Sequence, residues 1–240
     1  MEFRLFLMLS FYFLLGGLIT FHVNKTELSE EKRKNWLKYF VYLFLVNALF
    51  CTIVFLPSYF KVLGLLVICG GLIELISNAI STHKFKIGLV SLLVFMPFAL
   101  GFYTFCGMDA PYLLFTLFQT TVFDAFSQLS GQLMGKNKLV PSISPNKTWE
   151  GLLGGIVFSV ITAAAIHSVL KLELNVAILF GAVLSIAAFI GDLLASLCKR
   201  KFGIKDFSNF IPGHGGFLDR FDSLLASGTC MYLIFKLYLI

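Results

Sequence analysis

Charged side chains are scarce in this chain, and their scarcity excludes a soluble globular fold. Asp, Glu, Lys and Arg make up 13% of the 240 residues, and 58% are hydrophobic, whereas soluble domains are about 25% charged and 45–50% apolar. The short alternating strands of a transmembrane barrel are also missing. Several apolar windows reach the roughly 20 residues that a helix needs to cross a bilayer. The chain is therefore predicted to be an all-α, polytopic helical membrane protein.

Two further absences narrow the class of function. The five cysteines have no paired spacing, which excludes a zinc finger or a disulfide scaffold and predicts buried free thiols. The net charge is +6, but no basic soluble segment is present to carry nucleic-acid binding. We therefore expect no nucleic-acid partner and assign the positive charge to a surface that meets anionic headgroups or nucleotides.

The apolar windows predict about eight transmembrane helices within a single domain, residues 1–240. The first window follows Arg4 and has no small-residue cleavage site, so it is predicted to be a retained span rather than a signal peptide. No internal repeat or low-complexity linker divides the chain. The predicted spans are 5–22, 39–56, 62–79, 87–105, 111–129, 151–170, 175–197 and 217–238.

The distribution of lysine and arginine predicts the orientation. Fifteen of the 19 cationic residues lie in or beside the connections after the first, third, fifth and seventh spans. The opposite side carries only Arg4, Lys61, Lys171 and Lys236. Cationic residues gather on the cytoplasmic side of membrane proteins. Both termini are therefore expected outside, and the polar connections are expected in the cytoplasm.

Four carboxylates at span ends are the first candidates for chemistry: Asp124, Asp192, Asp219 and Asp222. Ionisable groups are costly within a bilayer and are often functional there. Helical spacing places Ser196 and Lys199 on the same face as Asp192. The alternative is that the acids pair with cations only to hold helices together. Glu74 is ambiguous, as the partner of a cation or a polar contact between helices.

The stretch Ser196–Asp222 combines these acids with cations and glycines. Carboxylate oxygens suit magnesium, which also takes phosphates and water as ligands, and Asp192 with Asp219 is the predicted metal pair. Lysine and arginine bind phosphate oxygens, and glycine lets backbone N–H groups approach a phosphate. The predicted phosphate-binding residues are Lys199, Arg200, Lys205, His214, Gly215, Gly216 and Arg220.

A second polar connection, residues 135–151, offers a further set of substrate-binding candidates. Ser144, Lys147 and Thr148 supply two hydroxyls and a cation, next to Trp149 and Glu150. The alternative is a plain loop in which Ser144 caps the sixth helix, proline follows at its first position, and Trp149 anchors the interface.

These segments resemble the motifs of the phosphatidate cytidylyltransferases. The stretch Ser196–Asp222 has Ser, Lys-Arg, Lys-Asp, His-Gly-Gly, Asp-Arg and Asp at the family spacing. Ser144–Gly151 (SPNKTWEG) and Asp124–Gly131 resemble two further family motifs. The resemblance covers about residues 120–230, the predicted catalytic part. Two positions depart from the family pattern. Cys198 stands where an aliphatic residue is usual, and Ser127-Gln128 stands where many members have Ala-Tyr.

The resemblance implies transfer of a cytidylyl group from CTP to phosphatidate, giving CDP-diacylglycerol and pyrophosphate in phospholipid biosynthesis. It implies magnesium on Asp192 and Asp219, with Asp124 and Asp222 in support. Lys147, Ser144 and Thr148 would position substrate, and Ser196 would belong to the same site. Expected partners are CTP, phosphatidate and membrane lipids, with a homodimer left open. The expected location is the bacterial inner membrane, with the site facing the cytoplasm.

Two other functions compete with this reading. A CTP-dependent enzyme acting on a polyprenol or another lipid would use the same charged groups. An ion-coupled transporter would also place acids within its spans, although transporter sites usually lie near the midplane on broken helices. Here the acids lie at span ends beside polar connections, which favours chemistry at the interface.

Overall fold

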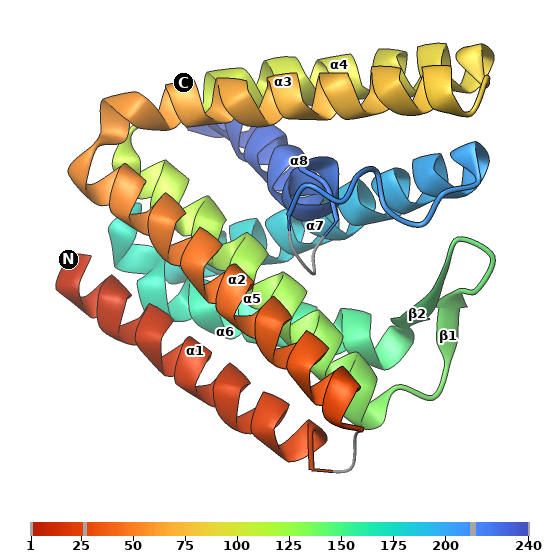
Figure 1. Cartoon of the computed structure of the whole chain (residues 1–240). Coiled ribbons are helices and arrows are strands. Elements are labelled where there is room, and N and C mark those ends of the chain that lie inside the picture. Colours follow the sequence, from red (N-terminus) through yellow and green to blue (C-terminus); the bar gives the residue numbers. More distant parts are fainter. Residues whose placement is uncertain (1, 26–27, 212–214, 240) are drawn as a thin grey trace.

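The computed structural model describes residues 2–25, 28–211 and 215–239 as a bundle of α-helices (Figure 1). Within that part of the chain, each predicted span corresponds to one α-helix. The helices are α1 (Glu2–Val23), α2 (Ser29–Phe55), α3 (Pro57–Ser81), α4 (Phe85–Phe105), α5 (Ala110–Met134), α6 (Trp149–Ile166), α7 (Leu174–Phe202) and α8 (Leu218–Ile234). A 3₁₀ turn (His167–Val169) follows α6, and a π-helical turn (Phe235–Leu239) follows α8.

Composition separates these helices into two groups. Six helical segments of the described chain are long and apolar enough to cross a membrane, namely Phe3–His22, Ser29–Phe55, Pro57–Ser81, Phe85–Phe105, Trp149–Val169 and Leu174–Phe202. Of the remaining two, α5 carries more polar residues and α8 is shorter, with 17 residues. The prediction of a helical membrane protein is confirmed at this level.

The helix α5 lies at the centre of the bundle. Every residue from Leu113 to Phe123 is buried, including three threonines and Gln119. Its polar groups find partners on neighbouring helices, since the hydroxyl of Thr120 lies 2.6 Å from that of Ser227 on α8. Such hydrogen bonds join helices inside a membrane protein. The other helices thus shield α5 from lipid.

Close packing of α6 against α5 depends on glycine. A Cβ at Gly155 would lie 2.8 Å from the ring of Phe123, and one at Gly151 would lie 2.7 Å from the carbonyl oxygen of Ser127. Real Cβ contacts are not this short. The glycine run of α6 therefore allows the two helix backbones to approach, as small residues do in membrane bundles.

The ends of the bundle differ in what they carry. In Figure 1 the N and C labels lie at one end, and the C-terminal ends of α1, α3, α5 and α7 lie at the other. This second end, called the hairpin end below, also holds two short antiparallel strands, β1 (Lys138–Val140) and β2 (Ser144–Thr148). The four connections rich in lysine and arginine begin there.

Two local predictions differ from the structure. Ser144 and Pro145 do not begin the sixth helix: they lie in β2, and α6 begins at Trp149 with Thr148 as its N-cap. The Thr148 hydroxyl accepts the Gly151 N–H at 3.1 Å, which makes it a better cap than Ser144. The seventh helix extends to Phe202, a few residues beyond the predicted span 175–197. Gly203 ends it with φ +80°, a conformation that favours glycine.

Candidate active site

The start of α8 is held in place by one buried acid, Glu74 of α3. Its Oε1 accepts the Phe217 N–H at 2.8 Å and the Ser208 hydroxyl at 2.7 Å, and its Oε2 accepts the Leu218 N–H at 2.9 Å. The first N–H groups of a helix have no partner within the helix, and a carboxylate is favoured there by the helix dipole. Glu74 is therefore a contact between helices, and its partners among the described residues are N–H and O–H groups rather than a cation.

Asp219, in the first turn of α8, has both oxygens engaged. Its Oδ1 lies 2.6 Å from Nζ of Lys199, and its Oδ2 accepts the N–H groups of Phe207 and Gly216, each at 2.8 Å. The side chains of the ion pair are 3% and 12% exposed. Asp219 thus joins the end of α7, the following loop and the start of α8. A metal ion at Asp219 would have to compete with the ammonium of Lys199.

The other three acids, Asp124 on α5, Asp192 on α7 and Asp222 on α8, form a separate group. Each interacts electrostatically with the other two. Ser223 links two of them, because its hydroxyl donates to Oδ1 of Asp124 at 3.1 Å and its N–H donates to Oδ1 of Asp222 at 2.7 Å. We call this group the acid cluster. The consecutive helices α7 and α8 and the more distant α5 converge on it.

A cation lies against the acid cluster. Nζ of Lys147, from β2, is 2.6 Å from Oδ2 of Asp192 and 4.8 Å from the centre of the Phe189 ring. Apart from this ion pair, Nζ of Lys147 has no hydrogen-bond partner within the described part of the chain. Arg220 and Lys147 both interact electrostatically with Asp124. Lys199 interacts in the same way with Asp222, so the three acids lie among three cations, from β2, α7 and α8.

Side-chain hydrogen bonds join the turn of the β-hairpin to α7 and the segment before β1 to the start of α6. Nε of Arg200 donates to the carbonyl of Ile143 at 3.0 Å, and its Nη1 donates to that of Ile204 at 3.3 Å. Glu150 accepts from the N–H and the side-chain amide of Asn137, at 3.2 and 2.7 Å. These contacts place Lys147 beside Asp192.

The remaining predicted site residues have varied surroundings. Ser196 is buried, with its hydroxyl 3.4 Å from Oδ1 of Asp192, whereas Lys205 is exposed. Thr148 is buried as the helix cap, and Ser144 is half-buried in β2. Gly215 has φ +81°, which favours glycine. His214 lies outside the described residues.

Gly216 differs from its expected role, because its N–H already has a partner within the protein. That N–H donates to Asp219. A Cβ on Gly216 would also overlap the carboxylate of Glu74. Lack of a side chain at this position therefore lets the start of α8 approach α3.

The chemistry of the acid cluster fits a divalent cation bound jointly with a substrate. Among residues 2–25, 28–211 and 215–239, no group of three or more His, Cys, Asp or Glu side chains is arranged to hold a metal ion. Magnesium usually needs only one or two carboxylates, and takes phosphates and water as its other ligands. The Lys147 ammonium on Asp192 also marks a position where positive charge is stabilised.

Three residues that organise the site were missed or left open by the sequence analysis. Ser208 and Ser223 gave no signal of their own, because isolated serines are common in helices and loops. Glu74 did give one, as a lone acid in an apolar helix, but its partners could not be predicted because they lie more than 130 residues away.

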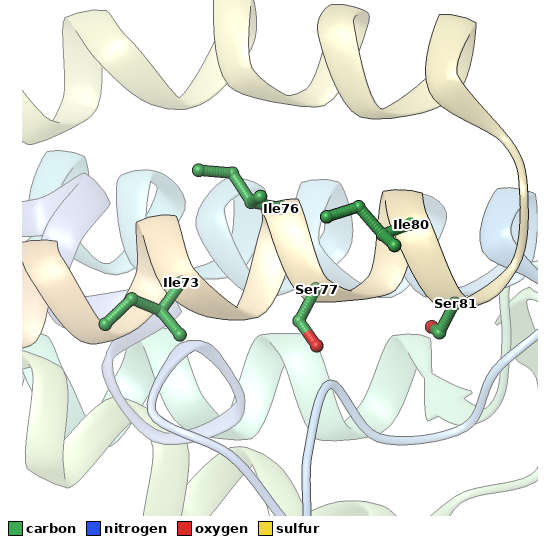
Figure 2. A pocket seen from close by; sticks show the side chains of 5 residues that line it. All are labelled: Ile73, Ile76, Ser77, Ile80 and Ser81. Carbon is green, nitrogen blue, oxygen red and sulfur yellow. The ribbon is translucent and has the colours of Figure 1, made fainter.

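A pocket on α3 can be excluded as the reacting centre. A pocket of about 400 Å³ on α3 is lined by Ile73, Ile76, Ser77, Ile80 and Ser81. Figure 2 shows that all five side chains project from this one helix. The lining includes no charged group, so this pocket is not suited to phosphate chemistry.

Comparison with known proteins agrees with the motifs and the geometry. A model of the "Cytidylyltransferase family" matches residues 3–238. The chain belongs to this family. A phosphatidate cytidylyltransferase of Rickettsia bellii (strain RML369-C) is 34% identical over 229 residues, covering 90% of this chain and 98% of the relative.

Staphylococcal relatives match a shorter segment of the chain at higher identity. The phosphatidate cytidylyltransferase of Staphylococcus aureus (strain COL) is 45% identical over 116 residues, and that of Staphylococcus epidermidis (strain ATCC 12228 / FDA PCI 1200) is 44% identical over the same length. Each match covers 48% of this chain and 45% of the relative, so the chain spans about half the length of these proteins. The family resemblance inferred from the motifs is confirmed.

Proposed function

We propose that the protein is a phosphatidate cytidylyltransferase. It would transfer the cytidylyl group of CTP to phosphatidate, giving CDP-diacylglycerol and pyrophosphate. The observation that carries the proposal is the acid cluster, in which Asp124, Asp192 and Asp222 meet beside Lys147 and Arg220 at the hairpin end of an apolar bundle. The name of the relatives supports the choice of substrates.

The reaction requires stabilisation of the negative charge on the phosphates rather than a strong general base. A phosphate oxygen of phosphatidate attacks the α-phosphorus of CTP, and the bond between that phosphorus and the bridging oxygen to the β-phosphate breaks, which releases pyrophosphate. The attacking oxygen is already ionised at neutral pH. Phosphoryl-type transfer depends mainly on alignment and electrostatic stabilisation. Lys147 and Arg220 would bind phosphate oxygens, and Arg200 would keep Lys147 near the cluster through its bond to the hairpin.

Magnesium is part of the proposal. Asp192 and Asp222, with Asp124 next to them, would hold it, and it would supply neutralisation of the phosphate charge when bound. Asp219 was the other predicted ligand, but its ion pair with Lys199 and its two N–H contacts suit it better to orienting the first turn of α8. The ammonium of Lys147 would then leave Asp192 for a substrate phosphate.

The proposed topology has eight spans, with both termini outside and the hairpin end in the cytoplasm. The charge distribution supports it, because 15 of 19 cationic residues lie at or near that end. The relatives named above are bacterial, which agrees with an inner-membrane location. CTP is water-soluble and would reach the acid cluster from this side.

A pyrophosphate-release assay tests the activity. Purified protein in detergent is expected to release pyrophosphate only when CTP, phosphatidate and magnesium are all present, and chelation with EDTA should stop release until magnesium is restored. Equal turnover with a polyprenol phosphate would favour a different lipid acceptor. Absence of release, together with proton- or sodium-dependent solute uptake in proteoliposomes, would favour a transporter. Molecular mass measured in the same detergent tests for a homodimer.

A further inference from the structure

Unlike the pocket on α3, a groove between α4 and α7 connects the surface of the bundle to the acid cluster. It has a volume of about 400 Å³ and lies between α4 and α7, with residues of α3 and α8 in its wall. Val90, Val94 and Phe98 line it from α4, and Leu194 and Ala195 line it from α7. Apart from Ser91 and Cys198, its polar lining residues are Lys86, Lys201 and Asp222. The groove is therefore apolar along its length and charged at two specific places.

The length of the groove matches one leaflet of a bilayer. Lys86 lies in the first turn of α4 and Lys201 in the last turn of α7, so both belong to the hairpin end. Phe98 is 12 residues further along α4, which corresponds to about 18 Å at 1.5 Å per residue. Half of a roughly 30 Å hydrocarbon core is about 15 Å. An acyl chain of one leaflet would fit alongside the groove.

The charges at the mouth favour an anionic headgroup. Lys86 and Lys201 are both exposed, and neither side chain forms an ion pair within the described residues. Lysines at a membrane interface attract anionic lipids. Asp222 lies in the wall of the same groove, between Leu218 and Leu225 of α8, so the apolar path passes directly beside a member of the acid cluster.

We propose that this groove holds an acyl chain of phosphatidate while its phosphate lies at the acid cluster. The inference rests on the proposed function, because it takes phosphatidate as the acceptor. The groove assignment also specifies that the lipid enters between α4 and α7, and which residues limit the size of the acyl chain that fits. Val94 and Leu194 would contact the chain, and Lys86 and Lys201 would receive the incoming headgroup.

A pair of neighbouring substitutions on α4 tests the groove. Val94 lines it, whereas Leu93 is exposed on α4 outside the lining. Val94→Trp is expected to raise the KM for long-chain phosphatidate by about tenfold and leave the KM for CTP unchanged, because hydrophobic pockets discriminate by factors of this order. Leu93→Trp should match the wild type. Equal effects of the two substitutions on both constants would overturn the proposal.

A binding measurement separates this proposal from the activity itself. Phosphatidate with a photoactivatable group on one acyl chain is incorporated into nanodiscs that contain the protein, without CTP, and labelled peptides are identified by mass spectrometry. Label is expected on residues 87–98 and 191–201, and should decrease in Val94→Trp but not in Leu93→Trp. Label spread evenly over all outer helix faces would overturn the proposal, as would disulfide-linked dimers of Val94→Cys, which would assign the groove to a second copy.

The two failures are distinguishable. If wild-type protein releases no pyrophosphate with phosphatidate, the proposed function fails, whatever the label shows. If release occurs but Val94→Trp and Leu93→Trp have the same kinetics, only the groove assignment fails.

Discussion

The ammonium of Lys199 lies 2.6 Å from Oδ1 of Asp219, and this buried pair joins the last turn of α7 to the first turn of α8. The same carboxylate accepts two backbone N–H groups through its other oxygen. One side chain therefore fixes the relative position of two helices that each contribute an acid to the cluster. Polar groups so fully paired are expected to matter for both stability and alignment.

Removing one member of this pair should destabilise the protein strongly. Asp219→Asn leaves the Lys199 ammonium buried without a counter-ion, which costs about 3–5 kcal/mol when a buried pair is broken. The double variant Asp219→Asn with Lys199→Met should recover part of that loss. Thermal unfolding in detergent measures both. Additive losses in the two single variants and the double variant would show that the pair is not coupled.

Glu74→Gln should impair the site from a distance. The amide keeps the size of the side chain but replaces one acceptor oxygen by a donor, so at least one of the N–H and O–H groups at the start of α8 loses its partner. Loss of a hydrogen bond to a charged group costs about 2 kcal/mol. We expect a lower Tm and a lower kcat with an unchanged KM for CTP. Ser77→Ala, on the outer face of α3, is the control, and a normal kcat in Glu74→Gln would contradict the positioning role.

Gly216→Ala tests the close approach of α3 and α8. The added methyl group would overlap the Glu74 carboxylate, which cannot easily move because three groups hold it. We expect loss of both thermal stability and pyrophosphate release. Gly16→Ala is a suitable control, since its methyl group would meet only the Tyr39 ring at 3.9 Å. Wild-type behaviour of Gly216→Ala would show that the loop relaxes.

Asp222→Asn should separate chemistry from folding. The acid cluster places Asp222 against two like charges, so its neutralisation should not unfold the protein. Loss of electrostatic stabilisation at a reacting centre lowers the rate by about a hundredfold or more. The paired measurements are pyrophosphate release and Tm. Asp109→Asn, at the start of α5 at the opposite end of the bundle, should retain activity, and substantial turnover by Asp222→Asn would remove this residue from the mechanism.

Lys147→Gln should affect substrate binding more than stability. The ammonium makes one ion pair and one ring contact, so its main role is expected with substrate present. Loss of a charge-assisted phosphate contact costs about 2 kcal/mol, which raises the KM for CTP or phosphatidate. Lys138→Gln, on an exposed position of β1, is the control. Equal KM values for the two variants would exclude Lys147 from phosphate binding.

Much of this molecule follows from local sequence. The apolar windows predicted the positions of the helices, and six helical segments of the described chain are long and apolar enough to cross a membrane. Three of the four acids that the sequence singled out, Asp124, Asp192 and Asp222, interact with one another in the structure. The helical spacing of Asp192 and Ser196 predicted their contact, which the structure has at 3.4 Å.

Tertiary contacts could not be predicted in the same way. The preference of magnesium for carboxylates suggested Asp192 and Asp219 as a pair, whereas in the structure Asp219 is paired with Lys199 and Asp192 interacts with Asp124 and Asp222. The choice depends on how α7 and α8 are rotated, which no local pattern specifies. The β-hairpin was missed because Ser144-Pro145 is equally typical of a helix start.

The polarity of α5 has a consequence for how this protein is made. Among the helices of the described chain, α5 and α8 are the two that lack the length or apolar character of an independent membrane span, and they carry three of the four predicted acids. A segment of this kind is poorly retained by lipid alone, so we expect its residence in the bilayer to depend on neighbours already in place. Biogenesis would then couple completion of the bundle to appearance of the site, and partly inserted chains would be inactive.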